Sequence, residues 1–99
     1  MPQEKTDSGA PVRVTVSLPA PLVRLFPGAE DKVEMEASCV RSMIAELDRR
    51  WPGMADRICD SRPAIRKHMN VFVEGRRAKL DTPLNPDMQI TILTAMSGG

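Results

Sequence analysis

The segment VRSMIAELDRRW, residues 40–51, decides the fold of this chain. Its apolar side chains recur at the 3.6-residue period of a helix, at Val40, Met43, Ile44, Leu47 and Trp51. Charged residues fill the opposite side, so the segment predicts a helix with a single apolar stripe. Ser38 is the candidate N-cap, and Pro52 with Gly53 ends the helix.

Two strands are expected before this helix. Val12–Leu18 alternates apolar and polar residues strictly, which is typical of a half-buried strand. Pro19 and Pro21 end it, and residues 22–26 are expected to form an apolar turn. Lys32–Ala37 alternates again and completes a hairpin.

The residues after the helix alternate in the same way. Residues 54–59 predict a short helical turn, and residues 60–68 a basic loop. Two more strands are expected at Met69–Glu74 and Gln89–Thr94, with residues 75–77 as a turn.

The predicted order is therefore strand, strand, helix, strand, strand. One striped helix can cover one face of one sheet, which gives a two-layer α+β domain. Its mixed sheet has four to five strands, and the first and last strands run parallel in the middle. We expect a flexible N-terminal tail at residues 1–11, a domain at 12–94 and a mobile C-terminal tail at 95–99.

Composition limits the possible functions. A formal net charge of +1 and the lack of a long apolar run favour neither nucleic acid nor membrane as a partner. The polar start of the chain lacks a secretory signal, so we expect a cytoplasmic protein. Cys39 and Cys59 are expected to be free thiols, and no ligand spacing predicts a metal site.

Catalytic groups are scarce. The chain has one histidine, His68, and no tyrosine, so we expect no active site and no enzyme. Cys39 would open the helix, where a reactive thiol is conceivable, although a small buried residue is the simpler interpretation. Six cations could cluster after the helix or could be a solvated surface: Arg57, Arg62, Arg66, Lys67, Arg76 and Arg77.

The end of the chain carries the functional signal. The last predicted strand ends at Thr94, and the five residues that follow it end with Gly98 and Gly99. Phe72 and Leu93 break the rule that outward strand positions are polar. An exposed apolar pair beside a mobile tail indicates a surface for partner docking.

These residues resemble the ThiS/MoaD family of ubiquitin-like sulfur carriers, and within it the CysO-like carriers of cysteine biosynthesis. The resemblance covers residues 12–99 and rests on the first strand, the helix, NVFVEG at 70–75 and ITILTAMSGG at 90–99. It implies a ubiquitin-like β-grasp fold. It also implies that the chain binds no cofactor and that a partner enzyme uses ATP.

The resemblance assigns roles to residues near the C-terminus. Gly99 would be adenylated by an E1-like adenylyltransferase/sulfurtransferase and then carry a thiocarboxylate, and Gly98 would let the tail pass into a partner. Leu93 matches the apolar position that such carriers present to partners. Strand phase, rather than the resemblance, adds Phe72 as a docking residue, and Met96 is a further candidate. A cysteine-synthase-like enzyme would accept the sulfur, and a metal-dependent peptidase is a further candidate partner.

Other functions fit the same features. The chain could be the small subunit of molybdopterin synthase, paired with its large subunit. It could instead be a thiamin-thiazole sulfur carrier or a ubiquitin-like protein modifier. A plain interaction module without a working tail is the last alternative.

Overall fold

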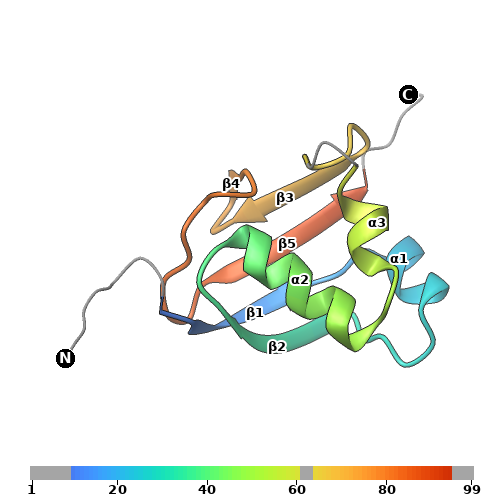
Figure 1. Cartoon of the computed structure of the whole chain (residues 1–99), viewed down its shortest axis with the longest axis horizontal. Coiled ribbons are helices and arrows are strands. Elements are labelled where there is room, and N and C mark those ends of the chain that lie inside the picture. The colour runs from blue at the N-terminus through green and yellow to red at the C-terminus, as the bar shows by residue number, and fades with distance from the viewer. Residues whose placement is uncertain (1–9, 61–63, 95–99) are drawn as a thin grey trace.

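The computed structural model describes residues 10–60 and 64–94 and contains one mixed sheet (Figure 1). The strand order is β2-β1-β5-β3-β4. The strands are β1 (Val12–Ser17), β2 (Lys32–Ala37), β3 (Met69–Val73), β4 (Arg76–Arg77) and β5 (Gln89–Thr94). Helix α2 (Val40–Arg50) lies across one face, while α1 (Ala20–Leu25) and α3 (Met54–Ile58) lie at one end of the sheet.

The first and last strands pair in the middle of the sheet, as predicted. β1 runs parallel to β5, with Val16 opposite Ile90, and antiparallel to β2. β5 is antiparallel to β3 on its other side, with Val71 opposite Ile92. The predicted α+β architecture is therefore confirmed, and the sheet has five strands.

The core lies between α2 and the inner face of the sheet. Ile90 and Ile92 of β5 and Val16 of β1 are completely covered, as are Val40 and Leu47 of the helix stripe. Burying an aliphatic side chain of this size contributes about 1.5–3 kcal/mol. Among the described residues no polar or charged side chain is fully buried, so apolar packing alone defines the inner face of the sheet.

The expected apolar turn at residues 22–26 is wrong, because residues 20–25 form helix α1. Pro21 lies in its first turn, where its missing N–H costs no hydrogen bond and its fixed φ suits a helix. Leu22 is buried against the core, whereas Leu25 points outward. The prolines that end β1 therefore also start a helix.

Helix α2 begins one residue later than predicted, with Cys39 rather than Ser38 as its N-cap. Cys39 is still extended, with φ −155°, and its carbonyl accepts the first helical bond, from Met43 N at 3.0 Å. The hydroxyl of Ser42 accepts from the backbone N–H groups of Ser38 at 3.0 Å and Cys39 at 3.1 Å. The Ser42 side chain, which lies inside the first turn, thus provides a hydrogen-bond acceptor for backbone N–H groups at the start of the helix.

Residues 75–77, predicted as a turn, include the short strand β4. Arg77 pairs with Phe72 and Arg76 with Val73. The reversal takes place at Glu74 and Gly75, with φ of 52° and 82°. Two successive residues with positive φ are typical of the tight hairpin turns that suit the twist of paired strands.

Candidate functional site

The C-terminal end of β5 is paired on one side. Thr94, the last residue of the strand, pairs with Met69 of β3, and Ile92 is completely buried. β1 pairs with β5 only at Gln89, Ile90 and Thr91. The end of β5 is therefore fixed by β3 and by the burial of Ile92. Met96, Gly98 and Gly99 lie outside the described residues, as do the predicted tails apart from Ala10 and Pro11, which are exposed.

The outer face of the sheet, opposite α2, carries the predicted apolar pair. Leu93 lies opposite Asn70, and Phe72 lies opposite Thr91, so Leu93 and Phe72 are diagonal neighbours on the same face. The side chain of Leu93 is 45% exposed. Only one other large hydrophobic residue in the described part of the chain is as exposed, namely Leu25.

Phe72 is more covered than its strand phase predicts. It is half-buried rather than exposed, because Thr91 of β5 flanks it on one side and Arg77 of β4 on the other. Leu93 has a neighbouring strand residue, Asn70, on one side only. Leu93 is therefore the main apolar contact that this face offers, and Phe72 forms its inner edge.

The neighbours of this pair are polar. Asn70 lies opposite Leu93 and Thr91 opposite Phe72, while Arg77 of β4 lies on the other side of Phe72. Thr91 in turn lies opposite Ser17 of β1 on the same outer face. An apolar centre with a polar surround resembles the core and rim of a protein interface.

The two cysteines are separate and free. Burial raises the pKa of Cys39, but hydrogen bonds with Ser42, together with smaller contributions from Arg41 and Ser38, outweigh it and leave this pKa below its ordinary value. Burial raises the pKa of Cys59, and the charge of Asp60 adds to the effect. Neither thiol lies beside a histidine, and His68 is exposed within the loop before β3.

No group of three His, Cys, Asp or Glu side chains within residues 10–60 and 64–94 could hold a metal ion. No helix in the same part of the chain is long and apolar enough to cross a membrane. The strongest pKa shift belongs to Glu46, whose hydrogen bonds with Arg49 and Arg50 lower it to about 2. These three residues lie on successive turns of α2, so the shift reflects a helix-surface ion pair.

The fold brings several of the six cations together. Arg57 and Arg66 line one hollow, and Arg66, Lys67 and Arg77 line a second, smaller one. Arg76 precedes Arg77 on β4. Arg62 lies outside the described residues. The sequence did not indicate that Leu25 and Phe26 face the first two arginines, because α1 and α3 are far apart along the chain.

Comparison with known proteins gives a consistent result. Residues 16–99 match the ThiS family. The sulfur carrier protein CysO of Mycobacterium tuberculosis is 27% identical over 94 residues, which cover 89% of this chain and all of that protein.

Solved structures agree with this match. A chain from the Amycolatopsis orientalis BexX/CysO complex superposes with a TM-score of 0.76 at 28% identity, covering 87% of this chain and 99% of that one. SAMP1 from Haloferax volcanii superposes with a TM-score of 0.74 at 19% identity, covering 88% and 99%. At that identity the second likeness concerns the fold alone.

Proposed function

Because this chain belongs to the ThiS family, we propose that it is a sulfur carrier whose reactive group is the C-terminal carboxylate of Gly99. One observation carries the proposal. The family match extends over residues 16–99 and so includes Gly98 and Gly99 as well as the folded body.

The free carboxylate of Gly99 is a poor acyl electrophile, so it must first be activated. An oxygen of the Gly99 carboxylate attacks the α-phosphorus of ATP in an E1-like enzyme, and pyrophosphate leaves. The resulting acyl adenylate is activated, so one equivalent of hydrosulfide from a donor displaces AMP and leaves a thiocarboxylate and a proton. ATP is bound by the partner enzyme, and this chain needs no cofactor of its own.

The body of the carrier serves to present its tail. Five residues follow Thr94, and a chain of that length spans at most about 17 Å when extended. Gly98 and Gly99 have no Cβ, so they can enter a channel in which a side chain would clash. Docking of the body then keeps the terminal carboxylate at high effective concentration in the partner's active site.

The outer face of the sheet is the proposed docking surface, with Leu93 at its centre, Phe72 beside it and Met96 as a further contact. The partial exposure of Leu93 beside the end of β5 supports this assignment. The similar chain from Amycolatopsis comes from a complex of two proteins, BexX and CysO. We expect this chain likewise to bind an activating enzyme and a sulfur-accepting synthase in turn.

Cysteine biosynthesis is the favoured pathway. The relatives named CysO are 24–28% identical over most of this chain, whereas the structures named as archaeal modifiers are 16–23% identical. The acceptor is then a serine-derived metabolite bound to a cysteine-synthase-like enzyme. A metal-dependent peptidase would release the product if the amino acid became attached to the tail. The free thiols of Cys39 and Cys59 suit the reducing cytoplasm, where we expect this cycle to run.

Intact mass spectrometry tests the proposal. The chain is incubated with its cognate E1-like enzyme, ATP and sulfide, and the expected product has one oxygen of the terminus replaced by sulfur. A chain lacking Gly99 is the control; it should keep its melting temperature and its mass. An unchanged mass of the full chain would contradict the carrier function. Transfer of the sulfur to O-phosphoserine or O-acetylserine by the cognate synthase separates the cysteine pathway from its alternatives.

A further inference from the structure

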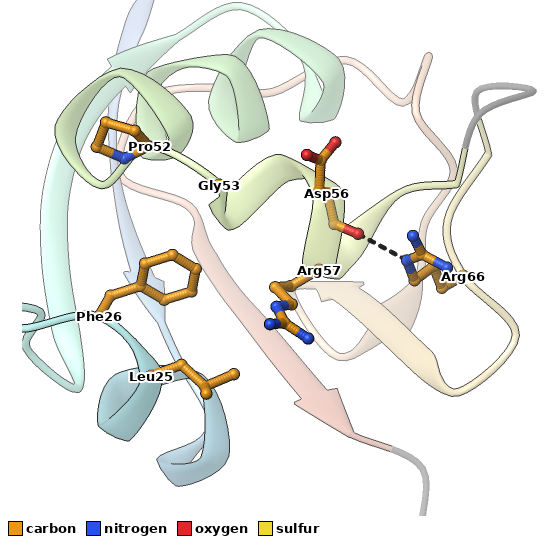
Figure 2. A pocket seen from close by; sticks show the side chains of 7 residues that line it. All are labelled: Leu25, Phe26, Pro52, Gly53, Asp56, Arg57 and Arg66. Carbon is orange, nitrogen blue, oxygen red and sulfur yellow. Dashed lines mark hydrogen bonds between the residues drawn. The ribbon is translucent and has the colours of Figure 1, made fainter.

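A hollow of about 660 Å³ opens between α1 and α3, away from the outer face of the sheet (Figure 2). Its walls come from three separate parts of the chain: the end of α1, the start of α3 and the segment before β3. The lining residues are Leu25, Phe26, Pro52, Gly53, Asp56, Arg57 and Arg66. Its volume is within the range of ligand and peptide sites.

One wall of the hollow is apolar and unpartnered. Leu25 is 52% exposed, the largest exposure of any big hydrophobic residue in the described part of the chain. Phe26 is half-buried beside it, and Figure 2 shows both side chains on the same side of the hollow. A pair of large apolar side chains left open next to each other favours contact with another apolar group.

The other wall is cationic. The guanidinium of Arg66 is held in place, because its Nε donates to the backbone carbonyl of Asp56 at 2.7 Å. Figure 2 shows the Asp56 carboxylate directed away from Arg57. Neither arginine forms an ion pair within the residues that the structure describes, so both positive charges are available to a ligand.

The hollow is preformed. The Asp48 carboxylate accepts from the backbone N–H groups of Gly53 at 3.0 Å and Ala55 at 3.1 Å, which fixes the start of α3. Gly53 has φ of +101°, and a Cβ there would lie 3.4 Å from the ring of Phe26. The two walls are therefore held at a fixed separation, which lowers the entropy cost of binding.

The hollow also lies close to the end of β5. The carbonyl of Arg66 accepts from Met69 N at 2.9 Å, and Met69 pairs with Thr94. Figures 1 and 2 both show β5 running toward the end of the molecule where α1 and α3 lie. A protein that binds at the end of β5 can therefore reach the hollow.

We propose that this hollow is a second docking site, which takes an acidic segment of a partner protein. An aliphatic side chain of that segment packs on Leu25 and Phe26, while flanking carboxylates pair with Arg57 and Arg66. The charges of Arg57 and Arg66 favour an anionic occupant. The exposed side chain of Leu25 favours an occupant that also carries an apolar side chain. The proposal does not depend on the sulfur chemistry, because it concerns binding to the folded body.

Titration of the ¹⁵N-labelled full chain with the blocked peptide Glu-Asp-Leu-Asp-Glu, followed by NMR, tests the proposal. Amide shifts should change at the end of α1, in α3 and around Arg66. The double variant with Arg57→Gln and Arg66→Gln should bind about tenfold more weakly, since each exposed charge pair contributes only modestly. The matched control has Arg13→Gln and Arg76→Gln, which removes the same charge from β1 and β4 at residues that do not line this hollow, and it should bind like the unmodified chain.

Several outcomes would overturn the proposal. These are no binding, shifts confined to the outer face of the sheet, or equal weakening in both double variants. A peptide with serine in place of leucine must bind more weakly; equal affinity would remove the role of the apolar wall. Equal affinity for N-acetylglutamate would mean that the hollow takes a free small acid rather than a protein segment. A chain lacking Gly99 should bind the peptide normally, so failure here is distinct from failure of the carrier function.

Discussion

Replacing Leu93 by glutamate should impair docking far more than folding. Leu93 is 45% exposed, so about half of its surface already contributes to folding. Full burial of a leucine contributes about 1.5–3 kcal/mol, so the variant should lose about 1–1.5 kcal/mol of stability. For a domain of this size that lowers the melting temperature by roughly 5–10 °C.

The loss in docking should be larger. The exposed half of the leucine would contribute about 1 kcal/mol on burial by a partner, and a desolvated, unpaired carboxylate costs several kcal/mol more. Together these terms weaken binding by about 3 kcal/mol or more, which corresponds to roughly 100-fold. The maximal rate should change little, because the terminal carboxylate is untouched.

The assay measures the concentration of carrier that half-saturates ATP–pyrophosphate exchange by the cognate E1-like enzyme. Circular dichroism of the same samples gives the melting temperature. Gln89→Glu is the matched control, since it adds the same charge to the same strand and face but lies at the exposed start of β5. A half-saturating concentration close to that of the unmodified chain would refute the docking role of Leu93. A collapse of folding would show instead that the residue belongs to the core.

Three further predictions concern the body of the carrier. Asp48→Ala removes the carboxylate that caps α3 and should cost about 1–2 kcal/mol in urea unfolding, with most of the loss restored in Asp48→Asn; an unchanged midpoint would contradict the capping role. The pKa of Glu46 is lowered from 4.5 to about 2, so its contribution to stability is fully present above pH 4.5 and is lost as pH falls to about 2. The difference in urea midpoint between the unmodified chain and Glu46→Gln should therefore shrink across that window, and a constant difference would refute the ion pair as its source. Iodoacetamide at neutral pH should alkylate Cys39 faster than Cys59, because the pKa of the first thiol is lowered and that of the second raised; peptide mapping that shows equal rates would contradict this order.

The regular parts of the fold could be predicted because their residues alternate or recur without interruption. β5 occupies the predicted residues 89–94, and β2 the predicted 32–37. The stripe on α2 indicated its buried face correctly, since Val40 and Leu47 are completely covered. In these segments local pattern and tertiary packing agree.

The features that the sequence did not predict are short, or they depend on residues that lie far apart along the chain. β4 has two residues, too few for any periodicity, and it exists because Phe72 and Val73 offer partners for backbone hydrogen bonds. Pro19 and Pro21 predict the end of a strand, but proline also favours the first turn of a helix, which is where Pro21 lies in α1.

The candidate sites could be predicted only in part for the same reason, because their residues lie far apart along the chain. Strand phase placed Leu93 on the outer face, but it could not show that Arg77 and Thr91 cover much of Phe72. Only the tertiary fold brings Leu25 and Arg66 to the same hollow. Charge composition alone indicated basic residues without indicating which of them lie together.

The central position of β5 has a consequence for how the protein is made. The sheet cannot close until residues 89–94 have left the ribosome, because β1 and β3 have no contact except through that strand. A chain cut before residue 89 would keep the β1–β2 hairpin but would lose the strand that joins it to β3 and β4. The long-range pairing that completes the sheet is therefore made last in the order of synthesis, and such non-local pairing is the slow part of folding.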